Sequence, residues 1–412
     1  MTKVGYRMTE IGEIPEEWSL DILENEVEIM DSRRVPLSEV EREQRKGPFP
    51  YCGANGIIDY VDDYIFDEEA ILLAEDGGSY GKFQNSAYLM DGKYWVNNHA
   101  HIIKGKRGIV NNKYILYWLN YSDINKYISG STRAKLNQER LKSIPIPRVP
   151  LPEQQKIAEI LTTADDEIQK VNEQITLTEQ LKNGLMQRLL TIGIGHTRFK
   201  MTEIGEIPEE WEIKKIKDIS TYVTDGTHKT PHYIEEAQSG VPFISTENIK
   251  PYSNEFDFSR YKRYIDEISY KELSKRAKPE KGDLLISKCG TIGRTQLIRN
   301  DIKIGIFVGL LLVKIKNNTV SGQYFEDLLN SDKYRTIMES ISPGSTRKTL
   351  AIGMFKNILI PLPPLQEQQK IAEILTTVDN KLELLGNKRE KLNVLKKGLM
   401  DDLLTGKVRV KV

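Results

Sequence analysis

The stretch Glu-Gln-Gln-Lys-Ile-Ala-Glu-Ile-Leu-Thr-Thr fills residues 153–163 and returns letter for letter at residues 367–377. A Pro-rich segment precedes each copy. Each copy runs on to Gly-Leu-Met-x-x-Leu-Leu-Thr, at Gly184–Thr191 and Gly398–Thr405. An identity of this length does not arise by chance in a chain of 412 residues. The chain is therefore an internal duplication.

The repeated stretch predicts a long helix in each half, because Pro residues stop just ahead of it and apolar residues then recur at spacings of four and three. That 3.5-residue period is typical of a coiled-coil seam. We expect Glu153–Leu190 and Glu367–Leu404, each about 57 Å long at 1.5 Å per residue, to pack as an antiparallel pair. The alternative is two separate amphipathic helices, each packed on its own domain. The expected seam residues are Ile157, Leu161, Ile168, Val171, Leu375, Leu382 and Leu385.

A second repeated block fixes the domain organisation. Met8–Trp18 returns unchanged at Met201–Trp211, ahead of a globular segment in each half. The expected order is a first globular domain (1–149), a long helix (150–193), a linker with a second globular domain (194–363) and a second long helix (364–412). Short apolar runs alternate with helical patterns in both globular segments, which predicts a mixed α/β fold. Because the shared blocks are nearly identical and the segments between them have diverged, the pattern indicates one scaffold holding two different readers.

Composition excludes several classes of protein. The chain has 59 Lys+Arg against 59 Asp+Glu and only two cysteines, Cys52 and Cys289. A disulfide framework or a Cys-based zinc site is therefore not expected. No apolar run is long enough to span a membrane, and the N-terminus lacks the apolar core of a signal peptide. These features predict a protein of the reducing cytoplasm without a membrane partner.

The charge is unevenly distributed, and basic stretches cover a Gly-rich turn and a Gly-Ser-Thr-Arg segment in each half. From Lys82 to Val149 there are 12 Lys+Arg against 3 Asp+Glu, and from Glu212 to Pro363 there are 24 against 18. Lys and Arg interleaved with Tyr on loops suit phosphate contacts and base-edge readout. The alternative is a solvated surface with some core aromatic residues. The candidate DNA contacts are Tyr80, Lys82, Arg133 and Lys135 in the first domain, and His228, Lys229, Lys288, Arg294, Arg347 and Lys348 in the second.

Catalytic motifs are missing from the sequence. Pro50–Gly56 resembles the Gly-rich loop that binds S-adenosylmethionine in DNA methyltransferases, but the Pro-Pro motif that holds a flipped base does not accompany it. There is no P-loop. His228 and His232 have helical spacing, but Pro231 stands between them, so we expect no metal site. The chain is predicted not to be an enzyme and to hold no cofactor.

The doubled arrangement resembles the specificity (S) subunit of type I restriction–modification systems. The resemblance rests on Glu-Ile-Gly-x-Ile-Pro-Glu-x-Trp, on Pro-Leu-Pro-x-x-Glu-Gln-Gln-Lys-Ile-Ala-Glu-Ile-Leu and on Leu-Lys-x-Gly-Leu-Met-x-x-Leu-Leu-Thr, each present twice and together covering about residues 8–406. Asp225-Gly-Thr-His228 also looks like a loop of one class of these recognition domains.

The resemblance implies two target recognition domains, each reading half of a bipartite, asymmetric double-stranded DNA sequence. It also implies that the long helices set the spacing and bind two modification (M) subunits, with restriction (R) subunits joining through the M complex. S-adenosylmethionine, ATP and Mg²⁺ would then belong to partner subunits. Two other hypotheses stay open: a stand-alone DNA methyltransferase or nuclease with degenerate motifs, and a coiled-coil adaptor without a DNA role.

Overall fold

The structure, a computed structural model, describes residues 4–130, 134–235, 240–259, 261–344 and 348–411. It divides into two compact units. Unit 1 comprises Met1–Glu173 and Asn387–Val412, and unit 2 comprises Gln174–Gly386. Each unit therefore takes its own globular part and one half of each long helix. The domain boundaries expected from the sequence stay a prediction.

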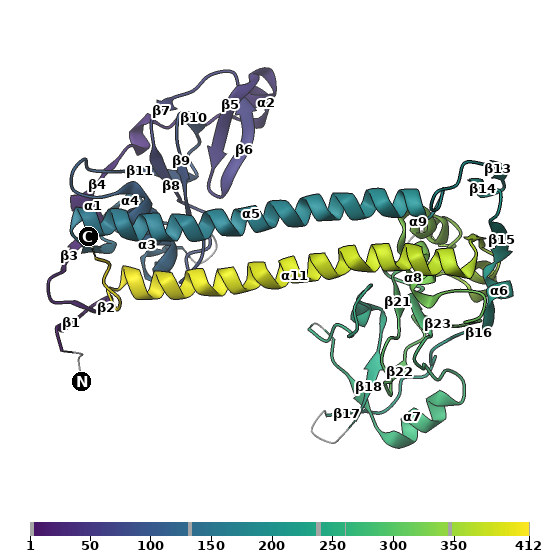
Figure 1. The fold of residues 1–412 in the computed structure, drawn as a ribbon. Coiled ribbons are helices and arrows are strands. Elements are labelled where there is room, and N and C mark those ends of the chain that lie inside the picture. The colour runs from purple at the N-terminus through teal and green to yellow at the C-terminus, as the bar shows by residue number, and fades with distance from the viewer. Residues whose placement is uncertain (1–3, 131–133, 236–239, 260, 345–347, 412) are drawn as a thin grey trace. The chain divides into compact units, whose positions relative to one another are not determined.

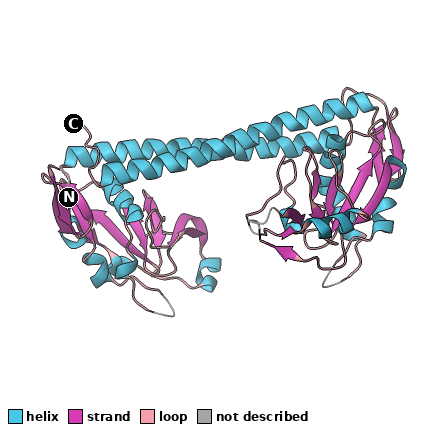
Figure 2. Ribbon diagram, turned by 90° about the horizontal axis from the view of Figure 1, so that it is seen from below, coloured by secondary structure: helices cyan, strands magenta, loops and turns pink. Residues whose placement is uncertain are grey.

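Two long helices, α5 (Leu151–Leu189) and α11 (Leu365–Leu404), begin directly after the Pro-rich segments. In unit 1 the beginning of α5 lies beside the end of α11, and Leu161 shares a core with Leu403 there (Figures 1 and 2). In unit 2 the order is reversed, and Leu189 shares a core with Leu375. The two helices are therefore antiparallel, which confirms the predicted fold class with its helix pair.

The duplication also appears in the ion pairs between the helices. Asp165 Oδ1 lies 2.5 Å from Lys396 Nζ in unit 1. Asp379 Oδ1 lies 2.6 Å from Lys182 Nζ in unit 2. The two aspartates occupy corresponding places in the repeat, as do the two lysines, so one helix–helix contact is made twice.

The seam residues differ in how far they are covered. Ile168 and Leu382 are half-buried, and five are buried: Ile157, Leu161, Val171, Leu375 and Leu385. Ile157 and Leu161 also belong to the core that contains Trp18 and Tyr114 of the globular part. Helix–helix packing and packing on the unit's own domain, which the sequence posed as alternatives, therefore occur together in unit 1.

The globular part of unit 1 contains two four-stranded sheets. The first is antiparallel and has the order β4-β11-β8-β9, and helix α3 covers it. All five residues of β8 are buried, as expected for a central strand with both faces covered. The elements are β4 (Val27–Ile29), β11 (Ala100–Gly105), β8 (Ala70–Ala74), β9 (Ala87–Met90) and α3 (Asn112–Tyr121). The second sheet has the order β6 (Gly56–Val61), β5 (Lys46–Gly53), β10 (Lys93–Val96) and β7 (Phe66–Asp67).

Unit 2 repeats this plan with different side chains. Its first sheet has the order β16-β23-β20-β21, again antiparallel and covered by a helix, α8. Each second sheet contains one parallel pair, β5 with β10 and β18 with β22. The first sheet and its helix are β16 (Ser220–Asp225), β23 (Leu310–Ile315), β20 (Leu284–Ser287), β21 (Thr295–Leu297) and α8 (Gly322–Asn330). The second sheet consists of β17 (Tyr233–Ile234), β19 (Tyr264–Ile265), β18 (Val241–Ile244) and β22 (Gly305–Ile306), and unit 2 also contains α7 (Glu267–Ser274) and α9 (Asp332–Ser340).

Short elements at the ends of each globular part complete the fold. A hairpin opens each unit, and the next strand pairs with the strand of the Pro-rich segment. In unit 1 these are β1 (Tyr6–Thr9), β2 (Gly12–Pro15), β3 (Ser19–Ile22), β12 (Pro145–Arg148), α1 (Leu23–Glu26), α2 (Glu39–Gln44) and α4 (Gln138–Lys142). In unit 2 they are β13 (Phe199–Thr202), β14 (Gly205–Pro208), β15 (Glu212–Lys215), β24 (Leu359–Leu362), α6 (Ile216–Ile219) and α10 (Ile352–Lys356). No helix in the described part of the chain is both long and apolar enough to cross a membrane.

The two repeated sequence blocks meet inside each unit. Trp18 Nε1 donates to Glu153 Oε2 over 3.3 Å in unit 1, and Trp211 Nε1 donates to Glu367 Oε2 over 3.0 Å in unit 2. We call the opening block together with the repeated helix stretch the shared frame.

The residue after each of these glutamates holds the globular insert. Gln154 Oε1 accepts a hydrogen bond from the backbone N–H of Asn111, the N-cap of α3. Gln368 Oε1 accepts one from the backbone N–H of Ser321, the N-cap of α8. The same Glu-Gln pair therefore ties the frame together and grips the insert in both units.

Candidate nucleic-acid interface

One end of the first sheet carries an aspartate at the same place in both units. The strand register shows that the two places are equivalent. One row of paired residues, Ile71–Ile103–Ile29, crosses three neighbouring strands in unit 1, and the row Leu284–Val313–Val223 crosses the corresponding strands in unit 2. Two residues beyond the last member of each row stand Asp31 and Asp225. Both side chains are buried. The diverged inserts thus place a carboxylate at one common site.

In unit 2 Asp225 gathers three basic side chains. Lys288 Nζ lies 2.6 Å from its Oδ2, His228 Nε2 lies 3.3 Å from the same oxygen, and the Arg276 guanidinium binds Oδ1. Burial acts to raise the pKa of Asp225, but hydrogen bonds from Lys288 and Arg276 outweigh it and lower that pKa below its usual value. The group is therefore a buried carboxylate paired with cations.

In unit 1 Asp31 is the centre of a different set of partners. Its Oδ2 lies 2.6 Å from Nδ1 of His101, and its Oδ1 accepts from the Ile102 backbone N–H over 2.9 Å. The second nitrogen of the His101 ring, Nε2, lies 2.7 Å from the Leu136 carbonyl oxygen. Burial acts to raise the pKa of Asp31, but the hydrogen bond with His101 helps to lower it below its usual value.

A second carboxylate, Glu75, extends the unit 1 cluster. It lies 2.6 Å from Arg34 Nη1 and 2.7 Å from Lys135 Nζ. Glu75 directly follows β8, as Lys288 directly follows β20, so unlike charges occupy equivalent places. We call these residues the charged edge of each unit: Asp31, Arg34, Glu75, His101 and Lys135 in unit 1, and Asp225, His228, Arg276 and Lys288 in unit 2.

In both units a leucine three residues after the Gly-Ser-Thr-Arg sequence hydrogen-bonds to the charged edge. The Leu136 backbone N–H donates to the Glu75 carbonyl over 2.8 Å, and the Leu350 backbone N–H donates to the Lys288 carbonyl over 2.8 Å. Leu136 and Leu350 hold corresponding positions in the repeat. Residues 131–133 and 345–347, including the candidates Arg133 and Arg347, lie outside the described residues.

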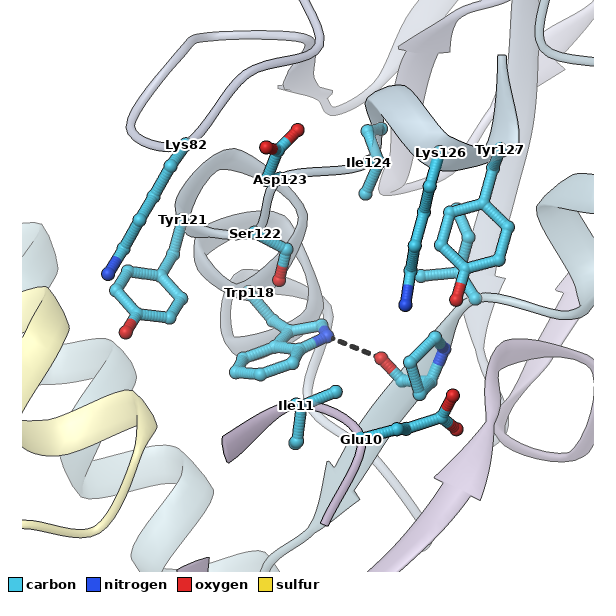
Figure 3. Close-up of a pocket in the computed structure, with 12 residues that line it drawn as sticks. Glu10, Ile11, Lys82, Trp118, Tyr121, Ser122, Asp123, Ile124, Lys126 and Tyr127 are labelled. Carbon is cyan, nitrogen blue, oxygen red and sulfur yellow. Dashed lines mark hydrogen bonds between the residues drawn. The ribbon is translucent and has the colours of Figure 1, made fainter. Parts of the chain in front are cut away.

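Tyr80 and Lys82 make internal contacts in unit 1. The buried Tyr80 hydroxyl donates to the Ala74 carbonyl over 3.1 Å. Lys82 Nζ lies 3.0 Å from Asp401 Oδ1 on α11 and 4.5 Å from the ring centre of Tyr121. Figure 3 shows Lys82 beside Tyr121 at a pocket of about 240 Å³. Because their polar groups are engaged within the unit, we leave Tyr80 and Lys82 out of the proposed contact set.

The other described candidates divide by exposure. Lys135, Lys229 and Lys348 are exposed, and the His228 side chain is 61% exposed. Lys288 is almost covered by its contact with Asp225, and the half-buried Arg294 donates to the Ile249 carbonyl. The exposed group is available to a ligand, whereas Lys288 and Arg294 serve first to hold the loops of unit 2.

Sequence reasoning missed the two arginines of the charged edge. Arg276 follows α7 and its side chain is 52% exposed, and Arg34 bridges Asp31 and Glu75. Their roles depend on strand pairing over long sequence separations. The pattern Asp-x-x-basic, present at Asp31–Arg34 and Asp225–His228, was a local signal that could have pointed to Arg34, whereas no local signal pointed to Arg276.

Metal and thiol chemistry have no evident site in the residues that the structure describes. Within them, no group of three or more His, Cys, Asp or Glu side chains could hold a metal ion. His228 and His232 lie instead near Asp225 and Asp266. Burial raises the pKa of the Cys52 thiol to about 12, so this thiol stays protonated at neutral pH.

Comparisons with known proteins agree with the doubled architecture. The family model of the type I restriction modification DNA specificity domain matches residues 15–179 and 208–394. The chain is 27% identical over 424 residues to the specificity subunit of the type I restriction enzyme MjaVIII of Methanocaldococcus jannaschii, covering 97% of this chain and 94% of the relative. It is 32% identical over 386 residues to a putative type I restriction enzyme specificity subunit, S.HindORF215P, of Haemophilus influenzae, covering 90% and 88%.

The fold has a counterpart among solved structures. The crystal structure of the S subunit of a type I restriction–modification system from M. genitalium matches with a TM-score of 0.62 at 15% identity, over 98% of this chain and 99% of that one. The family model covers more than half of the chain in two separate matches, one in each half. The chain therefore belongs to the family of type I restriction modification DNA specificity domains.

Proposed function

We propose that this chain is the non-catalytic DNA specificity subunit of a type I restriction–modification complex. Each unit reads one half of a bipartite, asymmetric target in double-stranded DNA. The observation that carries the proposal is the charged edge: one sheet position holds a buried carboxylate in both units, exposed cations belong to the cluster around it, and yet the surrounding side chains differ. Two units with the same fold but different side chains at this edge would recognise two different half-sequences.

The proposed DNA contacts are the exposed cations at and beside the charged edges. Lys and Arg there would neutralise phosphates, and Arg and His side chains held in fixed positions would read base edges. Arg294 and Lys288 support this surface from within. Among the described residues, the proposed contacts are Lys135 in unit 1, and His228, Lys229, Arg276 and Lys348 in unit 2. Arg133 and Arg347 lie outside the described residues and stay candidates from the sequence.

The repeated helix stretch supports two copies of one partner. Its buried members Glu153, Gln154, Ile157 and Leu161 have internal contacts that explain their repetition. The contacts found for the exposed members run along their own helix, such as Lys156 with Glu159 and Thr163 with the Glu159 carbonyl. Such local contacts do not require the same residues in both halves, yet these members too are identical: Gln155, Lys156, Glu159 and Thr163 in one copy, Gln369, Lys370, Glu373 and Thr377 in the other.

A leucine in the second half of each helix follows the same pattern. Leu181 is 54% exposed and its counterpart Leu395 is 55% exposed. Two identical exposed surfaces fit two identical modification subunits. Restriction subunits would then join through that complex, and S-adenosylmethionine, ATP and Mg²⁺ would be bound by the partner subunits. A complex that acts on chromosomal DNA would work in the cytoplasm, as the sequence predicts.

The helix pair is also proposed to set the spacing of the two half-sites. A four-residue insertion in one helix adds about 6 Å and rotates the rest of that helix by about 40°. Because four residues approximate one turn, much of the packing should survive. We expect the gap between the half-sites to lengthen by one or two base pairs, at roughly 3.4 Å each, with both half-sequences unchanged. An unchanged gap would contradict this part of the proposal.

The test of the proposed function uses the full chain with and without its modification subunit. The complex should methylate a bipartite sequence, mapped by sequencing modified DNA, and the chain alone should transfer no labelled methyl groups. Methyl transfer by the chain alone would favour the stand-alone enzyme. A complex that shows no sequence preference in binding or methylation would favour the adaptor without a DNA role.

A further inference from the structure

We propose that Asp225, and Asp31 at the equivalent place in unit 1, are positioning residues for sequence readout. The buried Asp225 carboxylate fixes partly exposed basic side chains at the sheet end so that they face DNA in one conformation. Asp31 acts indirectly, because Arg34 connects it to Glu75, which holds the exposed Lys135. The inference rests on the proposed function and adds the residues that control specificity within each reader.

The contacts of Asp225 come from three separate loops. His228 lies on the chain after β16, Arg276 follows α7, and Lys288 follows β20. Arg276 is held twice, because its Nη2 binds the Asp225 carboxylate and its Nε lies 3.3 Å from the Asp225 carbonyl oxygen. The Asp225 carboxylate thus connects side chains from three loops.

The cations retain capacity for a ligand. Half of the Arg276 side chain and more than half of the His228 side chain remain exposed. Asp225 supplies one negative charge against the two permanent positive charges of Arg276 and Lys288, so the cluster keeps an excess of positive charge. A planar guanidinium already fixed on one edge loses little further conformational freedom when its other edge binds a base or a phosphate.

Unit 1 supports the inference with different residues. Asp31 holds His101 and the Ile102 N–H, and Arg34 connects it to Glu75, which holds the exposed Lys135. The aspartate and its place in the sheet are common to both units, and one basic residue in each unit, Arg34 or His228, stands three residues after it. The other basic residues come from different points of the chain. Simple retention of a duplicated loop does not explain this arrangement, because the loops after Asp31 and Asp225 have different sequences.

A positioning role and a purely structural role predict different binding behaviour. Asp225→Asn removes the carboxylate charge and keeps the side-chain size. If Asp225 positions readers, the loosened cations should lose sequence discrimination but still attract phosphates. If Asp225 only stabilises the fold, binding to target and to unrelated DNA should fall together with the melting temperature.

The experiment measures the full chain in complex with its modification subunit. For Asp225→Asn we expect target affinity to fall by about 5- to 150-fold, the range for one good base contact. Affinity for unrelated DNA at low salt should stay constant or rise. Maps of methylated DNA should relax in the half-site read by unit 2 alone. Asp31→Asn should relax the other half-site, and Arg276→Gln should reproduce the Asp225 effect without altering a buried group.

Glu267→Gln is the matched control, because Glu267 also pairs with a lysine in unit 2, Lys303, but is half-exposed and is not a member of the charged edge. It should change neither affinity. The inference is overturned if Asp225→Asn and Arg276→Gln leave specificity unchanged, if they relax both half-sites, or if target and unrelated DNA lose affinity in parallel. A wild-type complex without sequence preference would instead overturn the proposed function.

Discussion

The charged edges of the two units compensate a buried carboxylate with different sets of side chains. Unit 2 surrounds a single buried carboxylate, Asp225, with cations. Unit 1 places a second carboxylate, Glu75, where unit 2 has Lys288, and balances it with Arg34 and Lys135. A buried carboxylate requires cations or hydrogen-bond donors in either case. The difference teaches that the two inserts share the aspartate at one position of the sheet, whereas the charges around it differ between them.

The helix packing provides the strictest test of the equivalence between units. Leu161 and Leu375 are corresponding residues of the repeat, and both are 0% exposed. Leu161→Ala and Leu375→Ala should each lower the free energy of unfolding by about 2–5 kcal/mol, because each leaves a cavity in a core. Denaturant unfolding followed by circular dichroism measures the loss. A large loss of unfolding free energy in one variant and none in the other would show that the two helix contacts are not equivalent.

A second test uses a position where the units differ. Tyr117 and Asp327 both stand six residues after the N-cap of their helix. The Tyr117 hydroxyl donates to Asp165 over 2.8 Å, whereas neither Asp327 Oδ2 nor Asp379 Oδ2 has a hydrogen-bond partner among the described residues. Burial raises the pKa of Asp327 well above its usual value, and the charges of Glu326 and Asp379 raise it further.

The folded state therefore holds a proton on Asp327 that the unfolded chain releases near pH 4. This stabilisation of unit 2 is complete below that pH and is lost as the pH rises toward the folded-state pKa. Asp327→Asn should remove the dependence and make α8 more resistant to opening at neutral pH. Hydrogen exchange of α8, with α3 of unit 1 as the internal reference, checks the result. An identical pH dependence in wild type and variant would disprove it.

The exposed lysines beside the charged edges give a smaller effect. Lys135→Ala in unit 1 and Lys348→Ala in unit 2 should each weaken binding to every DNA sequence and flatten the salt dependence by about one unit. DNA binding by the complex across a range of salt concentrations measures the slope. Lys217→Ala, an exposed lysine on α6, is the control and should leave the slope unchanged. Loss of sequence preference without a change of slope would show that these lysines read bases instead.

The exposed leucines of the helices should affect folding least. Leu181→Ala and Leu395→Ala should each change the free energy of unfolding by less than about 0.5 kcal/mol, because both side chains already face solvent. Each variant should nevertheless weaken the docking of one modification subunit. Native mass measurement of the assembled complex counts the subunits. Full occupancy in the double variant would remove these leucines from the proposed docking surface.

The sequence predicted the parts of the molecule that depend on local signals. Proline stops, apolar periodicity and two identical blocks led to the long helices, their antiparallel pairing and the mixed α/β inserts. Tyr80 shows the limit of this reasoning, because its place in a Gly-rich turn of a basic stretch says nothing of the core into which its ring packs. Lys82 likewise pairs with Asp401, a residue more than 300 positions away in the chain.

The charged edge was beyond sequence reasoning for a related reason. Asp225, Arg276 and Lys288 meet only because the register of β16, β23 and β20 brings three distant loops together. No spacing between these residues encodes the contact. The carboxylates at residues 31 and 225 also follow strands with no shared sequence, so aligning the two halves by their letters does not reveal them.

The grip of the shared frame on its inserts has an evolutionary consequence. Gln154 and Gln368 hold α3 and α8 through the backbone N–H of the N-cap residue, an asparagine in one unit and a serine in the other. Every residue except proline offers the same group. A gene segment that encodes a new insert can therefore replace an old one by recombination between the repeats without losing this hydrogen bond, whichever residue other than proline stands at the N-cap. The architecture makes new DNA targets accessible in a single genetic exchange.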